Sequence, residues 1–181
     1  MEEGSAVQEP EVSLRIAMHY IESGKTCADV TVSIDGAHVR TKDVVHFDLT
    51  DFMRQSGYMK CDGDNFRWQG TYQADPSLPQ IIVSSKPGIG DVTIALNDGR
   101  TLYVESKKFK SGSGGEYPAM REAIGQLMTG CPDDSNVIPV VAVPHSAKSE
   151  SLARDWACNT RIRTAGIRFI LVREDGGIEL I

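Results

Sequence analysis

The chain has 181 residues, 40% of them hydrophobic and 24% charged, a length and composition that predict one globular domain with a sizeable core. Its formal net charge of −6 argues against a nonspecific coat on nucleic acid. No stretch approaches the roughly 18 apolar residues of a membrane helix, and the acidic opening MEEGSAVQEPE is unlike a signal peptide. The four cysteines are widely spaced and form no CxxC pair, which argues against a disulfide framework. A cytoplasmic protein without membrane contact is therefore expected.

The N-terminal end of the chain is predicted to hold a disordered tail, residues 1–9, followed by a single domain over 10–181. Pro10 and the apolar residues of PEVSLRIAMHYIESG recur at helical spacing and predict a helix over 10–23. Gly24 would end this helix, because glycine readily adopts the left-handed conformation found at helix ends.

A turn-rich segment, about residues 27–75, follows this helix and is predicted to be an insertion. The dipeptide Asp35-Gly36 in ADVTVSIDGAHVRTKDVVHF predicts a hairpin, and DLTDFMRQSGY predicts a short helix capped by Asp48 or Thr50. The insertion could serve target recognition. Its acidity suits a protein partner or a homodimer interface as well, and a role as surface decoration stays open.

The second half of the chain alternates strand and helix signals. QIIV, DVTIAL and RTLYVES predict three antiparallel strands, the last two joined by a tight turn at Asn97-Asp98-Gly99. Downstream, EYPAMREAIGQLMTG predicts a helix, NVIPVVAVP a strand buried on both faces, SESLARDWACNTRIRTAG a second helix, and the last residues a strand pair. This order predicts an α/β domain in which helices flank a mixed central sheet.

Charge is unevenly distributed along the sequence. Residues 1–75 hold 13 acidic and 7 basic residues, whereas the remainder holds 12 of each. The segment 145–173 is locally basic. Its cationic residues are Lys148, Arg154, Arg161, Arg163, Arg168 and Arg173, against Glu150 and Asp155. An acidic protein with one basic face is therefore compatible with the sequence.

Charged residues in the stretch GIGDVTIALNDGRTLYVESKKFK interrupt an otherwise apolar hairpin. Asp91 opens one strand and Glu105 lies late in its partner, so the tight turn brings them opposite each other. Glu105 and Lys107 project from the same face of their strand, and the Ser106 carbonyl lies between them. Two carboxylates and a carbonyl form an oxygen-rich site suited to Mg²⁺ or Mn²⁺. Lys107 could orient a water there or stabilise charge on a phosphate.

The succession of GD, a hairpin and VESKK resembles the catalytic signature of the PD-(D/E)xK nuclease superfamily, with Holliday-junction resolvase and VRR-type members most similar. Gln126 in REAIGQL agrees, since a glutamine often lies on the corresponding helix of such members. The resemblance covers roughly residues 78–145 and implies a restriction-endonuclease-like mixed sheet flanked by helices. Gly90 replaces the proline of the motif. The glutamate of the family's first helix corresponds to Glu11 or Glu22, and Glu11 is preferred because it lies early in the helix.

The function implied by this resemblance is metal-dependent hydrolysis of phosphodiester bonds in nucleic acid, with DNA favoured over RNA and an endonuclease over an exonuclease. The implied catalytic residues are Asp91, Glu105, Lys107 and Gln126, and the implied ligands of Mg²⁺ or Mn²⁺ are Asp91, Glu105, the Ser106 carbonyl and Glu11. Lys108 and Lys110 could contact the phosphate backbone, which would make binding salt-dependent.

Two other interpretations stay open. Asp91 could be a plain turn residue, with Glu105 and Lys107 forming an exposed cross-strand charge pair. Alternatively, a protein with a nuclease fold could bind or assemble within a larger nucleic-acid-processing or defence complex without cutting. The acidic charge and small size favour this second interpretation, whereas the intact triad argues against it, and metal-dependent turnover would discriminate between the two.

Overall fold

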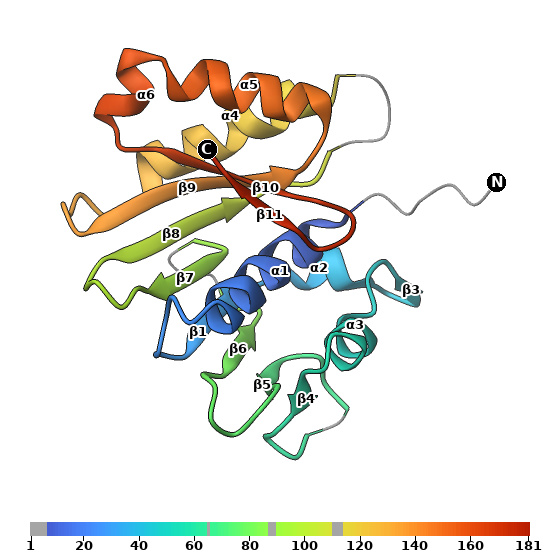
Figure 1. Cartoon of the computed structure of the whole chain (residues 1–181). Helices are drawn as coiled ribbons and strands as arrows, with labels where there is room; N and C mark the ends of the chain where they lie inside the picture. Colours follow the sequence, from blue (N-terminus) through green and yellow to red (C-terminus); the bar gives the residue numbers. More distant parts are fainter. Residues whose placement is uncertain (1–6, 65, 87–89, 110–113) are drawn as a thin grey trace.

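The computed structural model describes residues 7–64, 66–86, 90–109 and 114–181. They form a nine-stranded sheet with the order β11-β10-β9-β8-β7-β1-β6-β5-β4, together with a small hairpin of β2 and β3 (Figure 1). The strands of the large sheet are β1 (Val30–Ser33), β4 (Met59–Lys60), β5 (Gly70–Gln73), β6 (Ile81–Ser84), β7 (Val92–Ala95), β8 (Thr101–Ser106), β9 (Val137–Pro144), β10 (Arg168–Val172) and β11 (Ile178–Leu180). The hairpin comprises β2 (Arg40–Thr41) and β3 (Val44–Val45).

Helices cover both faces of this sheet (Figure 1). The long helix α1 packs on one face, and α4 and α5 pack on the other. Because β1 is parallel to β6 and β8 to β10 are mutually parallel, whereas the other pairs are antiparallel, the sheet is mixed. The predicted class, an α/β domain with a mixed sheet flanked by helices, is confirmed. The helices are α1 (Glu9–Glu22), α2 (Gly36–Val39), α3 (Leu49–Gln55), α4 (Glu116–Gly130), α5 (Ala147–Ala157) and α6 (Thr160–Thr164).

The strand β9 shows how two hydrophobic cores share one sheet. Successive side chains of a strand point to opposite faces. Val140 and Ala142 therefore join the core beneath α1, whereas Val141 and Val143 join the core beneath α4 and α5. All four are buried, as expected for a near-continuous apolar run in a parallel part of a sheet.

The hairpin of β7 and β8 forms as predicted. The turn closes through the Gly99 N–H, which donates to the Leu96 carbonyl at 3.0 Å, and Gly99 has a φ of 86° that favours glycine. In the ladder, Val92 lies opposite Val104. Asp91, the residue before this pair, also bonds to Val104 through its N–H, which leaves it next to Glu105.

The predicted hairpin at Asp35-Gly36 is wrong. Asp35 caps α2 instead, because its Oδ1 accepts a hydrogen bond from the Ala37 N–H at 2.9 Å. The strand before it, β1, lies between β7 and β6 in the large sheet. Of the three predicted antiparallel strands, β7 and β8 pair as expected, but β6 does not pair with β7, because β1 lies between them and is parallel to β6. The hairpin in this region lies further on, at β2 and β3.

The segment predicted as an insertion, about residues 27–75, is therefore built into the sheet, to which it contributes β1, β4 and β5. Its expected role in a homodimer or with a protein partner stays a prediction. The predicted tail is also shorter than expected. Val7 is buried and Glu9 begins α1, while residues 1–6 lie outside the described residues.

Toward the C-terminus, the helix predicted over SESLARDWACNTRIRTAG is two helices, α5 and α6. Ser146 caps α5 by accepting from the Ser149 N–H at 3.0 Å. Asn159 then caps α6 in the same way, so a capping side chain restarts the helix in a new direction. All four cysteines are free. Over the described ranges, no helix combines the length and the apolar character needed to cross a membrane.

Candidate metal-binding and catalytic site

Asp91 is fixed at the start of β7 by its own backbone. Its N–H donates to the Val104 carbonyl and its carbonyl accepts from the Ser33 N–H, both at 2.8 Å. The side chain is held as well, because Asp91 Oδ2 accepts from the Ser106 N–H at 2.8 Å. Three adjoining strand segments thus position one carboxylate at the end of the sheet.

Glu105 lies beside this carboxylate and is only 9% exposed. Burial, followed by the negative charge of Asp91, raises the pKa of Glu105 to about 7. Burial also raises the pKa of Asp91, although the Ser106 N–H and Lys107 oppose this shift. In its protonated form the Glu105 carboxyl donates a hydrogen bond to Asp91. The two side chains are therefore held together more easily with a shared proton, or a shared cation, than as two bare carboxylates.

Lys107 is equally buried, at 9% exposure. Its Nζ lies 3.8 Å from Glu9 Oε1, and the same carboxylate lies 3.3 Å from His38 Nδ1. The Lys108 N–H donates to Glu9 Oε2 at 3.4 Å. Burial raises the pKa of Glu9, and the charge of Lys107 opposes that shift. Glu9 thus ties the first turn of α1 to the end of β8.

Charge balance at this site favours a divalent cation. When ionised, the carboxylates of Glu9, Asp91 and Glu105 face the ammonium group of Lys107, so the cluster carries an excess of two negative charges when His38 is neutral and of one when it is protonated. An extended residue points its N–H and C=O to the same side of its strand. Since the Ser106 N–H faces Asp91, the Ser106 carbonyl faces the same side. Two carboxylates and this carbonyl are hard oxygen donors of the kind that Mg²⁺ and Mn²⁺ prefer.

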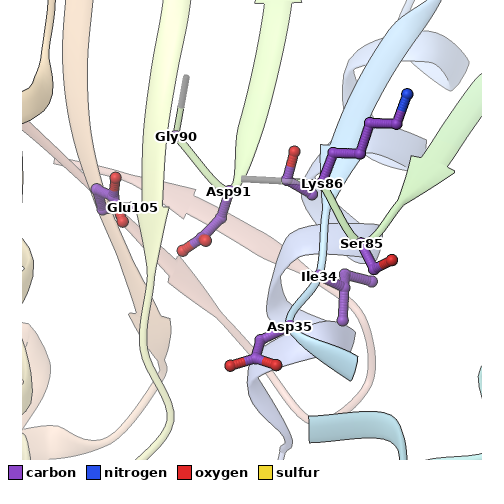
Figure 2. A pocket seen from close by; sticks show the side chains of 8 residues that line it. Ile34, Asp35, Ser85, Lys86, Gly90, Asp91 and Glu105 are labelled. Carbon is purple, nitrogen blue, oxygen red and sulfur yellow. The ribbon is translucent and has the colours of Figure 1, made fainter. Parts of the chain in front are cut away.

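Asp91 lines two pockets. The first, of about 440 Å³, is lined by Asp91, Glu105, Asp35 and Lys86, among others. Figure 2 shows the three carboxyl groups reaching it from different segments, while the Lys86 side chain extends away from them. The second pocket, of about 480 Å³, lies between α1, α2 and α4 and is lined by Lys107 as well as Asp35 and Asp91. Asp91 therefore lies where two substantial pockets meet.

Several of the predicted site residues gather here. Gln126 lines the second pocket from an exposed position on α4. Lys108 lines the same pocket, and its Nζ donates to Gln8 Oε1 at 3.2 Å. The Ser106 side chain points to the opposite face, where its Oγ accepts from Ser13 Oγ at 2.9 Å. Lys110 lies outside the described residues.

Glu11, the preferred glutamate of the first helix, is not part of this cluster. It accepts from Arg15 Nε at 2.8 Å and from the Gln8 N–H at 3.4 Å, in a capping box. Glu22, the other candidate, lies at the far end of α1 and accepts from the Tyr58 hydroxyl at 3.3 Å. Glu9 takes the predicted place instead. Two residues are about 200° apart around a helix, so Glu9 and Glu11 cannot serve the same site.

Sequence reasoning missed Glu9, His38 and Asp35. An acidic residue in a first helical turn is favoured by the helix dipole in any protein, so Glu9 carried no distinctive signal. His38 lies on a helix of four residues, too short to show periodicity. The one usable signal was the Asp-Gly pair, which is typical of a helix cap as well as of a hairpin.

A second group of possible metal ligands lies elsewhere, at His145, Glu150 and Glu179, whose ligand atoms are within 4.8 Å of one another. Arginines already neutralise its carboxylates. Arg154 Nη2 lies 2.9 Å from Glu150 and 2.7 Å from Glu179, and Arg173 Nη2 lies 2.9 Å from Glu179. This group therefore has little need of a cation, in contrast to the cluster at Asp91.

Metal titration should separate the two groups. We expect Mn²⁺, followed by calorimetry at pH 8, to bind the wild-type protein and Glu150→Gln with similar affinity, and to bind Asp91→Asn at least tenfold more weakly, because a lost ligand weakens a small cation site strongly. Binding that survives in Asp91→Asn and disappears in Glu150→Gln would assign the cation to the His145 group instead.

Similarity to other proteins does not add to this description. Comparison of the chain with models of known protein families, with curated proteins and with solved structures found no match in any of the three. The geometry and charge of the cluster at Asp91 are therefore the basis for assigning a function.

Proposed function

We propose that the protein is a metal-dependent nuclease of the PD-(D/E)xK type, which hydrolyses phosphodiester bonds in nucleic acid. One observation carries the proposal: Asp91 and Glu105 are held side by side at the end of the sheet, largely buried, with Lys107 next to them. Burying adjacent carboxylates costs stability, and a purely structural role does not explain why the fold keeps both. A cation site explains it, because a divalent ion attracts both carboxylates.

Each residue of the cluster has a definite task in such a reaction. Asp91, Glu105 and the Ser106 carbonyl would hold Mg²⁺ or Mn²⁺, which supplies Lewis-acid stabilisation of the charge that develops on the phosphate. Lys107 is too buried to act as a solvated charge and can hold a water or a phosphate oxygen by donating hydrogen bonds. Glu9 limits where the Lys107 ammonium can lie and so orients it.

The pockets support a polymeric substrate and cutting within the chain. A strand whose scissile phosphate lay at Asp91 could extend into both pockets, one of them lined by Lys86 and the other by Lys108. These cations can contact phosphates without reading the bases. An endonuclease must accommodate the strand on both sides of the scissile phosphate, whereas in an exonuclease the path of the strand is closed on one side. DNA is proposed over RNA from the resemblance alone, and the cluster itself suits either.

The topology is compatible with a restriction-endonuclease-like fold. The hairpin of β7 and β8 presents the cluster, α4 follows and lines the second pocket, and the buried strand β9 then pairs with β8 in parallel. This is the order that the sequence resemblance implies. The strand β1, between β7 and β6, shields the open side of the hairpin and lets the Ser33 N–H hold Asp91.

Cleavage of a panel of labelled DNAs and RNAs, with Mg²⁺, Mn²⁺ or EDTA, tests this function. We expect metal-dependent cutting by the wild-type protein, and a loss of at least a thousandfold in Glu105→Ala and in Lys107→Ala, because each change removes a group that acts on the phosphate. The substrate that is cut would identify the class of nucleic acid.

Lys148→Ala is the matched control for Lys107→Ala, because Lys148 is an exposed lysine on α5, and it should cut like the wild type. Absence of cutting on every substrate by a folded wild-type protein that also binds no Mn²⁺ would contradict the proposal. It would favour a nuclease-fold subunit that binds or assembles without cutting.

A further inference from the structure

The basic segment 145–173 divides into two groups of arginines. The first group, Arg154 and Arg173, is engaged by Glu150 and Glu179. The second group lies on α6 and at the start of β10. Within the described part of the chain, no carboxylate lies within 4.0 Å of its guanidinium groups, and its members are Arg161, Arg163 and Arg168.

Two of these arginines share a pocket of about 300 Å³. Arg163 belongs to the last turn of α6, and Arg168 is the first residue of β10. Gly166, with a φ of 72°, makes the sharp turn between them. The remaining lining residues are apolar and none is acidic: Ala157, Ile167 and Ile181. The fold therefore brings two cations to one opening without supplying a counter-charge from an acidic side chain.

The helix end explains only part of this arrangement. Cationic side chains in the last turn of a helix complement the partial negative charge of its free carbonyls, which accounts for Arg161 and Arg163. Arg168 is in a strand and gains nothing from that effect. Two guanidinium groups at one pocket repel each other unless an anion lies between them, and a phosphate group accepts hydrogen bonds from two guanidinium forks at once.

The position of the pocket fits a long substrate. The cluster at Asp91 lies at the end of the sheet where β9 finishes, because the Lys107 N–H donates to Ala142 of β9. From there α5 runs back along the sheet, and α6 lies at its far end (Figure 1).

The strand register gives the separation: Arg168 lies opposite Val140 of β9, and Val140 lies opposite Val104 of β8, the residue before Glu105. Two strand spacings amount to roughly 10 Å. Since phosphates of one strand follow at about 3.4 Å along a duplex axis, this distance corresponds to about three nucleotides.

We propose that the pocket between Arg163 and Arg168 binds a backbone phosphate of the nucleic acid a few nucleotides from the bond that is cut, an inference that rests on the proposed function. It anchors the substrate at a second point, independently of the metal. The basic face of an otherwise acidic protein then serves to contact the phosphate backbone of the nucleic acid. Such contacts add affinity for the substrate without sequence preference.

Binding measured in EDTA tests this anchor apart from catalysis. We compare the wild type with the double variant Arg163→Ala/Arg168→Ala on a labelled duplex of 30 base pairs, over a range of salt concentrations. The double variant should bind about tenfold more weakly at low salt, and the slope of log affinity against log salt should fall by about two, one for each lost phosphate contact. Arg100→Ala, which removes an exposed arginine paired with Asp98, should bind like the wild type.

Inorganic phosphate, followed through the amide NMR signals of Gly166 and Ile167, identifies the chemical group. Shifts in the wild type that are absent from the double variant support a phosphate site. Such shifts combined with unchanged duplex affinity and salt slope would overturn the proposal, because the pocket would then take a small phosphate-bearing molecule. Absence of both effects would overturn it as well and leave the arginines to a helix-end role or to an acidic protein.

The two proposals fail separately. A wild type that cuts nothing but loses duplex affinity in the double variant supports the anchor and contradicts the nuclease. A wild type that cuts, with a double variant of unchanged affinity and salt slope, supports the nuclease and overturns the anchor.

Discussion

Glu105→Gln should make the metal-free protein more stable at pH 8, on the order of 3 kcal/mol, while abolishing metal-dependent cleavage. The pKa of Glu105 rises from its ordinary 4.5 to about 7 in the folded protein. Between these two values the folded chain keeps a proton that the unfolded chain has released, so stability falls as pH rises, and the full cost is present above pH 7. At 1.36 kcal/mol for each pKa unit, this cost is about 3 kcal/mol. Glutamine does not titrate and escapes it.

Urea unfolding in EDTA at pH 5 and pH 8 measures this effect. The stability gained by Glu105→Gln over the wild type should be small at pH 5 and large at pH 8. Glu174→Gln, an exposed carboxylate in the turn before β11, should show no such pH dependence. Mg²⁺ at a thousandfold excess over Kd should reverse the order at pH 8, since about 4.1 kcal/mol of stabilisation would reach the wild type alone. A stability gain that shrinks with rising pH would contradict the raised pKa.

The opposed effects on stability and activity follow from how the site is built. Stability alone would be better served by an apolar or amide side chain beside Asp91 than by a second buried carboxylate. Active sites commonly hold groups that destabilise the fold. A variant that cleaves less but is more stable therefore identifies Glu105 as a functional carboxylate. Replacing a carboxylate with a structural role would lower both the cleavage rate and the stability.

Local sequence signals were sufficient to predict the central part of this site. The tight turn at Asn97-Asp98-Gly99 fixes the register of β7 and β8, and that register brings Asp91 next to Glu105 at the open end of the hairpin. Alternation along β8 then places Glu105 and Lys107 on one face. Each of these steps depends on neighbours in sequence, which is why they could be derived without knowing the rest of the fold.

Contacts between distant segments could not be derived in the same way. β1 pairs with β6 across a separation of about fifty residues, and the apolar alternation of both strands is equally compatible with other partners. Glu9 reaches Lys107 only because α1 packs across β8. His38 reaches Glu9 only because Asp35 starts a helix where a hairpin was expected. The predicted half of the site is local, and the missed half depends on long-range packing.

Gly90→Ala should disrupt the site without changing any of its charged residues, by displacing Asp91. Gly90 has a φ of 76°, a conformation that costs alanine about 1–2 kcal/mol. An added Cβ would also lie 2.9 Å from the ring of Tyr103 and 3.0 Å from the Val104 carbonyl. Tyr103 is buried and its hydroxyl donates to the Gly130 carbonyl at 3.1 Å, so the ring cannot swing aside. The start of β7 must move, and the Asp91 carboxylate moves with it.

We therefore expect Gly90→Ala to lose about 2–4 kcal/mol of stability and about a hundredfold in cleavage rate, the cost of a displacement near 1 Å in a positioned group. Gly99→Ala is the matched control at the other end of β7. It has a φ of 86° and no atom within 4 Å of an added Cβ, so it should lose only about 1–2 kcal/mol and cut at the wild-type rate. Urea unfolding and cleavage rates of both variants, measured under conditions in which each is folded, distinguish the cases. Equal cleavage by Gly90→Ala and Gly99→Ala would mean that the position of Asp91 does not limit the reaction, because only Gly90→Ala displaces it.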